Sequence, residues 1–203
     1  MHKGRTDKPG NVGISFGGSD TRSLQFLKSH DRFNIHEKLI SSRYVRNPNY
    51  KSAVLEFIKA NYFEKGCGLF GRGDPSVLAK LRDLLLNLQI SLSEIDINSL
   101  VETAVQRTRN WAHLSQLREA CCDNIVVREP VVLCPFCKAI NGAVIVTDVA
   151  YSRFQTVLEM TSEQYEAEMD NQTPDVEAVA ILVKQGFIPP YHHGCRGMIM
   201  LAR

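Results

Sequence analysis

The sequence has no long run of apolar residues. No stretch approaches the roughly 18–20 consecutive apolar residues of a membrane span, and the N-terminal MHKGRTDKPGNVG lacks the apolar core of a secretory signal. These absences predict a protein assembled in a cytosol, with no membrane partner. Because thiols stay reduced in a cytosol, the six cysteines are expected to be thiols or metal ligands and not disulfides.

Internal repeats and low-complexity tracts are also missing, which excludes solenoid and fibrous architectures. A chain of 203 residues with 44% hydrophobic and 23% charged residues has the composition of a globular protein. It is long enough for one domain with a sizeable core, or for one domain with an appendage.

Charge is distributed unevenly along the chain. Residues 1–51 carry ten Lys and Arg against four Asp and Glu, or +6, and the remainder carries 14 against 18, or −4. We therefore expect residues 1–47 to form a basic arm, either flexible or docked on a partner, with residues 1–23 lacking any hydrophobic period. The arm could contact nucleic acid or an acidic protein surface, or could be only a solvated tail.

Apolar spacing predicts that the middle of the chain is helical. Residues 48–97 should form a helical region, with one helix over about 49–63 and a second that starts at Asp74-Pro75, an N-cap carboxylate followed by proline. The glycine-rich stretch between these two helices is interpreted as a loop. A longer helix over about 98–120 has its buried stripe at Val101, Ala104, Val105, Thr108, Trp111 and Ala112, with Arg107, Arg109 and Arg118 expected off that stripe.

The chain then changes character at short β-branched runs. The segments NIVV, VVL and AVIV favour a small hairpin that carries a cysteine pair at its tip. Helical patterns return at about residues 152–171 and from Thr173, and a last short strand is expected at about residues 198–201. The predicted class is therefore α+β, mainly helical, with a small hairpin module.

The cysteine pair in LCPFCKAING has a matching pair near the end of the chain. Cys134 and Cys137 form Cys-x-x-Cys, and His192 and Cys195 form His-x-x-Cys. One pair offers two thiolates, and the other offers an imidazole and a thiolate. Two pairs of this spacing suit tetrahedral Zn²⁺, because a tight turn directs both side chains of a pair at one point. Glycines at 142, 194 and 197 can supply the turn conformations that such knuckles need. We predict a structural Zn²⁺ that joins the two ends of the excursion 138–191, with iron as an open alternative.

Other interpretations of these residues are weaker. A redox dithiol is expected beside a βαβ pattern, which is not readable here. His193 would leave only a one-residue gap to Cys195, and Cys67, Cys121 and Cys122 have no partner at ligand spacing, so they are interpreted as buried or semi-buried small residues.

No catalytic constellation is recognisable, so an enzyme is not expected. Four good ligands would close the zinc shell against a reacting water, and the His-x-Glu of a zinc deaminase is missing. The Glu166-Ala167-Glu168 sequence resembles the paired glutamates of an ADP-ribosyltransferase but is interpreted as an acidic, solvated helix face.

Three features in order resemble the phage minor head, or head morphogenesis, proteins related to the F protein of phage Mu. They are the helix LVETAVQRTRNWAHLSQLREA, the hairpin LCPFCKAINGAVI and the terminal IPPYHHGCRGMI. The resemblance covers residues 98–203. The family's terminal motif usually reads PPxHPNCRC, so this chain departs at His193, Gly194 and Gly197 but keeps the four predicted ligands.

The resemblance implies a minor capsid protein in the virion interior, assembled in the host cytoplasm. It implies a structural role near the portal, in head assembly and in DNA packaging or ejection, with portal or capsid proteins as partners and nonspecific contact with packaged DNA. The alternative is a zinc-ribbon module that binds nucleic acid through the basic arm with Arg107, Arg109 and Arg196.

Overall fold

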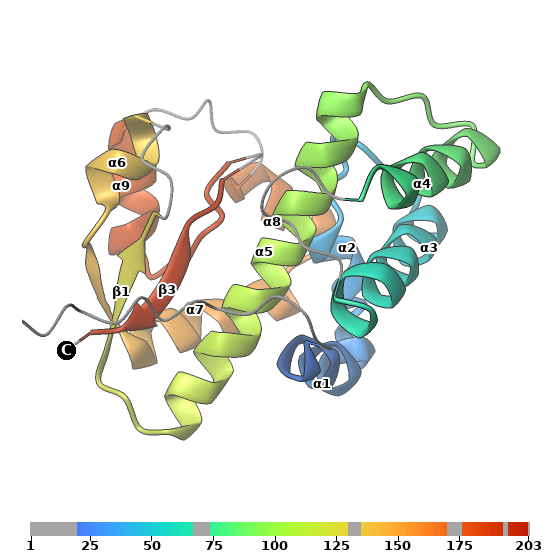
Figure 1. Cartoon of the computed structure of the whole chain (residues 1–203). Coiled ribbons are helices and arrows are strands. Elements are labelled where there is room, and N and C mark those ends of the chain that lie inside the picture. Colours follow the sequence, from blue (N-terminus) through green and yellow to red (C-terminus); the bar gives the residue numbers. More distant parts are fainter. Residues whose placement is uncertain (1–19, 67–73, 130–134, 170–175, 193–194, 203) are drawn as a thin grey trace, which may run out of the picture.

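The computed structural model describes residues 20–66, 74–129, 135–169, 176–192 and 195–202. Within these ranges the protein is mainly helical and has one small antiparallel sheet, so the predicted α+β class is confirmed (Figure 1). The elements are α1 (Thr21–His30), η1 (Asp31–Phe33), α2 (Ile35–Leu39), α3 (Pro48–Ile58), η2 (Lys59–Glu64), α4 (Pro75–Asn87), α5 (Glu94–Glu119), β1 (Asn124–Arg128), α6 (Pro135–Ile140), β2 (Val144–Val146), α7 (Thr147–Glu159), α8 (Ser162–Met169), α9 (Val176–Lys184) and β3 (Met198–Leu201).

The long helix α5 runs through the middle of the molecule. Helices α1 to α4 pack along one side of it, and α7 and β3 pack along the other (Figure 1). The helix begins one turn earlier than predicted, because the hydroxyl of Ser93 caps it by accepting a hydrogen bond from the Asp96 amide at 3.1 Å. The predicted apolar stripe is buried, but so are polar residues on the rest of the helix: Thr103, Gln106, Arg107 and Asn110.

Arg107 was expected off the buried stripe, and that prediction is wrong. The side chain is 3% exposed, and its Nη1 donates to the carbonyl of Lys38 at 2.6 Å. The guanidinium also lies 5.1 Å from the ring centroid of Tyr165. The middle of α5, where Arg107 lies, is surrounded by other elements, and Arg107 joins α2 and α8 to α5.

The N-terminal helices belong to the core, which corrects the predicted arm. Asp20 caps α1 by accepting from the Ser23 amide at 3.2 Å, and its carboxylate pairs with Arg109 on α5 at 2.7 Å. The ring of Phe26 packs 6.3 Å from Trp111. The expected arm over 1–47 is therefore wrong for residues 20–45, whose sparse apolar side chains are buried at helical spacing, and residues 1–19 lie outside the described residues.

Two helices in the first half start at a side-chain cap followed by proline, and the cap at Asp74 was predicted. Asp74 Oδ1 accepts from the Ser76 amide at 2.9 Å, so α4 starts at the predicted proline. Asn47 caps α3 in the same way, accepting from the Asn49 amide at 2.9 Å. The predicted helix over 49–63 is α-helical only to Ile58 and continues as the π-helix η2. Most of the glycine-rich loop, with Cys67, lies outside the described residues.

The sheet has the order β2-β1-β3, with both neighbours antiparallel to β1. The hairpin of β1 with β2 and the last strand at 198–201 were both predicted, and both are confirmed; the VVL segment lies outside the described residues. Side chains alternate between two faces, so Ile125, Ile145 and Ile199 face the core.

The helical segment predicted over 152–171 is two helices. Helix α7 already begins at Thr147, and α8 begins after Thr161. The break is a capping box: the Gln164 amide donates to Thr161 Oγ1 at 3.2 Å, and the Thr161 amide donates to Gln164 Oε1 at 2.9 Å. The sequence TSEQ at residues 161–164 has the pattern of a capping box, and the spacing of apolar residues does not reveal it.

A buried ion pair connects α8 to the N-terminal helices. Lys51, 1% exposed, donates from Nζ to Glu166 Oε1 at 3.2 Å and to the Glu37 carbonyl at 3.2 Å. Glu166 also accepts from the Ser42 amide at 2.9 Å. The expectation of a solvated glutamate face is therefore wrong for Glu166, which is a structural partner of Lys51.

We expect Lys51→Met to lower the free energy of unfolding by about 3 kcal/mol, because it leaves a partly buried carboxylate without its cation. The matched control is Lys59→Met, which removes the exposed i,i+3 pair with Glu56 and should cost about 0–1 kcal/mol. Urea denaturation measures both values. Equal losses in the two variants would contradict a structural role for the Lys51–Glu166 pair.

Candidate metal centre

The His-x-x-Cys pair lies on the segment that leads from α9 to β3. The Cys195 amide donates to the His192 carbonyl at 3.1 Å, which closes the tight turn expected from the two-residue gap. Cys195 is 1% exposed and His192 is half-buried. His192 and Cys195 are therefore joined by a backbone hydrogen bond, and the Cys195 thiol is shielded from solvent.

The first pair falls at a short helix and not on an open loop. Helix α6 occupies the connection between β1 and β2 and lies against α9 (Figure 1). The ring of Phe136 meets His192 edge-on, with 6.2 Å between the ring centroids. Because Phe136 precedes Cys137, the first turn of α6 lies beside the His-x-x-Cys turn.

The two thiols of the first pair are not part of the described set. Cys134 lies outside the described residues, as does the side chain of Cys137, and the same holds for His193. Among the residues that the structure describes, no group of three or more His, Cys, Asp or Glu side chains gathers at metal-binding distance. The four-ligand site remains a prediction.

A buried asparagine on α5 holds both ends of the His-x-x-Cys segment. Asn110, 2% exposed, donates from Nδ2 to the carbonyl of Pro189 at 2.8 Å and to the carbonyl of Gly197 at 2.9 Å. Its Oδ1 accepts from the Ile199 amide at 3.4 Å. One side chain thus satisfies three backbone groups that would otherwise be buried without a partner.

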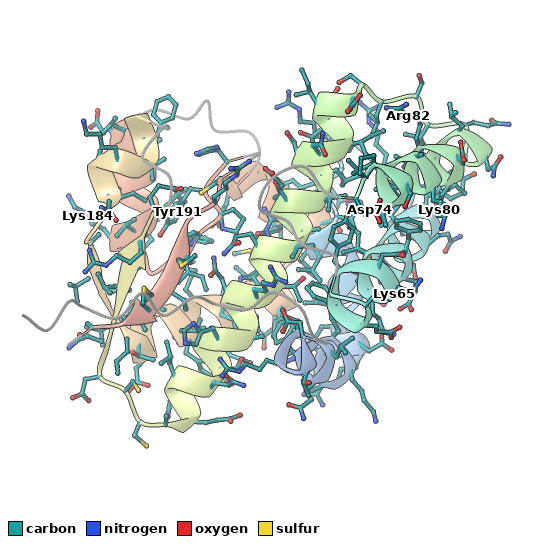
Figure 2. All side chains as sticks on the ribbon, viewed as in Figure 1. Lys65, Asp74, Lys80, Arg82, Lys184 and Tyr191 are labelled. Atoms are coloured by element: carbon teal, nitrogen blue, oxygen red, sulfur yellow. The ribbon has the colours of Figure 1, made fainter. Side chains whose placement is uncertain are left out.

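Further contacts fix the same segment. Arg196 pairs with Glu102 of α5 at 2.9 Å. Tyr191, labelled in Figure 2, is buried and donates to the Phe187 carbonyl at 2.9 Å. The residues on which the ligand turn depends, Asn110 and Glu102, were not singled out by sequence. Neither residue lies on the apolar stripe predicted for this helix, so apolar spacing gave no signal for them.

The glycines predicted for the knuckles have different physical roles. Gly142 has φ +92°, the left-handed conformation that was expected after the first pair. Gly197 is required for space instead, because a Cβ there would lie 2.9 Å from Cβ of Pro189 and 3.3 Å from Sγ of Cys195. Gly194 lies outside the described residues.

The other residues singled out from the sequence, three arginines and two cysteines, either form contacts within the protein or are at least partly exposed. Arg109 pairs with Asp20, so none of the three arginines assigned to nucleic acid lacks an internal partner. Cys121 is exposed, which corrects its expected burial, and Cys122 is half-buried. Cys121 stands at φ +55° where α5 ends, because the chain must reverse there into β1.

Comparison with known proteins finds no match for this chain among protein-family models, curated proteins or solved structures. Among the described helices, none combines the length and the apolar character that a membrane span requires.

We expect Asn110→Leu to lower the free energy of unfolding by about 3 kcal/mol. The substitution preserves volume but leaves the carbonyls of Pro189 and Gly197 buried without donors, at about 1–3 kcal/mol each. Urea denaturation followed by circular dichroism measures the loss.

The control is Gln106→Leu on the same helix, which removes one hydrogen bond of 3.4 Å to Asn110 and should cost less than about 1 kcal/mol. We call the three hydrogen bonds from Asn110 to Pro189, Gly197 and Ile199 the Asn110 clamp. If the Asn110 variant is as stable as the Gln106 variant, the Asn110 clamp contributes no stability and the segment from 189 to 199 is held by other contacts.

Proposed function

We propose that the chain is a structural protein of a phage head, of the minor capsid or head morphogenesis type, that acts near the portal. The observation that supports this most is the Asn110 clamp. It joins the helix, through Pro189 and Gly197, to the terminal segment, and Phe136 of the hairpin sequence meets His192 of that segment. The three sequence features that resemble the phage Mu F-related proteins are therefore in contact as one unit.

A structural Zn²⁺ belongs to this proposal, with Cys134, Cys137, His192 and Cys195 as its ligands. Three thiolates and one imidazole are a donor set that zinc accepts in closed structural sites. The turn between His192 and Cys195 and the contact of Phe136 with His192 support the pairing. Bound there, the ion would supply a cross-link between α6 and the segment before β3, and no reactive position.

The assignment as a non-enzyme rests on the same donor set. Four protein ligands leave zinc without an open position for water. Glu166, one of the two glutamates of the transferase-like motif, is paired with the buried Lys51. The partners proposed are portal or capsid proteins, with nonspecific contact to packaged DNA, in a virion assembled in the host cytoplasm.

The nucleic-acid-binding alternative loses support from the arginines assigned to it. Arg107 is buried, Arg109 pairs with Asp20, and Arg196 pairs with Glu102. Binding DNA through these groups would require their internal contacts to break. The basic residues of segment 1–19 lie outside the described residues and still allow weak contact with DNA.

Metal analysis tests the zinc proposal. Purified protein should contain about one Zn²⁺ per chain, and a chelator should lower its melting temperature, because structural zinc contributes on the order of 10 kcal/mol in small sites. Cys134→Ser should lose the metal, whereas Cys122→Ser, at a half-buried thiol away from the turns, should retain it. Iron would be recognised by its visible absorption. A metal-free chain whose melting ignores chelators would contradict the site.

Virion composition tests the assembly role. Mass spectrometry of particles from the phage or prophage that encodes the chain should find it in few copies, and its deletion should give heads that are misassembled or empty. The measurement that separates the alternative is a DNA titration against salt. An assembly protein should bind weakly, without sequence preference and with a steep salt dependence. Tight, sequence-selective DNA binding together with absence of the protein from particles would favour the alternative, a zinc-ribbon module that binds nucleic acid as a regulator.

A further inference from the structure

The sheet has one face in the core and a second face on which side chains of the two edge strands, β2 and β3, are exposed. In antiparallel strands, register partners lie on the same face. Val126 pairs with Val144 on one side and with Met200 on the other, so these three residues form a row across the sheet. Val144 is 60% exposed and Met200 is 47% exposed, with the buried Val126 between them. The half-exposed Val146 extends this apolar face along β2.

A cavity continues the apolar face beyond β3. It has a volume of about 300 Å³ and lies between β3, α5 and the start of α1. Met198 and Met200 line it from the strand, Ala112 lines it from α5, and its polar wall carries Arg22 and His113. Methionine side chains adapt to partners of irregular shape, which suits a binding surface. We call the row and this cavity together the sheet-face groove.

Positive charge borders the sheet-face groove. Arg128 pairs in register with Met198, so it lies on the same face, and it is exposed. Arg22 is exposed at the cavity, where the carboxylate of Asp20 is already paired with Arg109. Burial lowers the pKa of His113, Arg22 lowers it further, and the Ile199 backbone partly opposes them. His113 is thus neutral near pH 7, and the two arginines set the charge of the groove.

We propose that the sheet-face groove binds an amphipathic helix of a partner protein, with its apolar stripe on the exposed residues Val144 and Met200 of the row and its acidic flanks at Arg22 and Arg128. A helix laid on an apolar sheet face is one of the few stable layer arrangements. Acidic flanks follow from charge complementarity, which selects partners and orients them.

Other occupants fit the groove less well. A second copy of this chain would bring its own arginines against Arg22 and Arg128 across a twofold interface, where like charges repel. The chain's own residues 1–19, with Lys3, Arg5 and Lys8, carry the same sign as the groove. Nucleic acid would match the charge but would not cover the apolar row. A head assembly protein and a regulator could each use such a groove, so the inference stands independently of the proposed function.

A pair of designed helical peptides tests the proposal with the full-length protein. Both carry a leucine stripe; one has glutamates on its flanks, and the other has lysines at the same positions. We expect the glutamate peptide to bind about tenfold more tightly in fluorescence anisotropy at low salt, with the preference reduced as salt rises. Methyl signals of Met198 and Met200 should shift on binding in NMR spectra.

Variants locate the interaction. Met200→Asp should abolish binding of both peptides, whereas Leu86→Asp, at an exposed apolar residue on α4, should leave it unchanged. The double variant Arg22→Glu with Arg128→Glu should reverse the preference toward the lysine peptide, with circular dichroism confirming that it folds. This reversal is an outcome that general destabilisation cannot produce.

Three results would overturn the proposal. They are equal binding of the two peptides by the unaltered protein, binding that survives Met200→Asp, and sedimentation that shows self-association lost in Met200→Asp. The last result would assign the face to a second copy of the chain. None of these measurements involves DNA, zinc or phage particles, so failure here and failure of the proposed function are distinguishable.

Discussion

The amide of Asn110 determines where the last part of the chain lies. It is buried in the middle of α5, and its three hydrogen bonds hold Pro189, Gly197 and Ile199. The first two positions bracket the His192–Cys195 turn, and the third belongs to β3. Because buried backbone groups must be hydrogen-bonded, the segment has no equally stable position without this side chain. The candidate ligand turn, the sheet and the central helix are therefore coupled through one residue.

The same helix organises the opposite side of the molecule by similar means. Arg107 reaches the carbonyl of Lys38, and Arg109 reaches Asp20 at the start of α1. A helix that packs against elements on all sides cannot keep its polar residues in water, so they become connections between elements. This is why arginines that looked available for nucleic acid have internal partners. It is also why the basic N-terminal segment, from residue 20 onward, is part of the core.

These connections are compatible with a structural protein whose surfaces serve assembly. A backbone hydrogen bond joins the candidate residues His192 and Cys195, and Phe136 of α6 contacts His192. The sheet leaves one apolar face bordered by arginines. A folded module with exposed apolar side chains on its sheet suits a role in which partners are bound and oriented, and the proposed zinc would add a cross-link without chemistry. The resemblance to phage head proteins and the ligand set stay proposals, each with its own measurement.

The sequence by itself determined the local features of this protein. Asp74-Pro75 placed the start of α4, β-branched runs placed β1 and β2, and apolar spacing placed the buried stripe of α5, because these signals act within a few residues. Only the tertiary structure decided which polar residues are buried. Asn110, Arg107 and the Lys51–Glu166 pair read as surface residues until their partners, distant in sequence, are in place. The burial of a polar group depends on partners that are distant in sequence, and the periodicity of residues along the chain does not identify them.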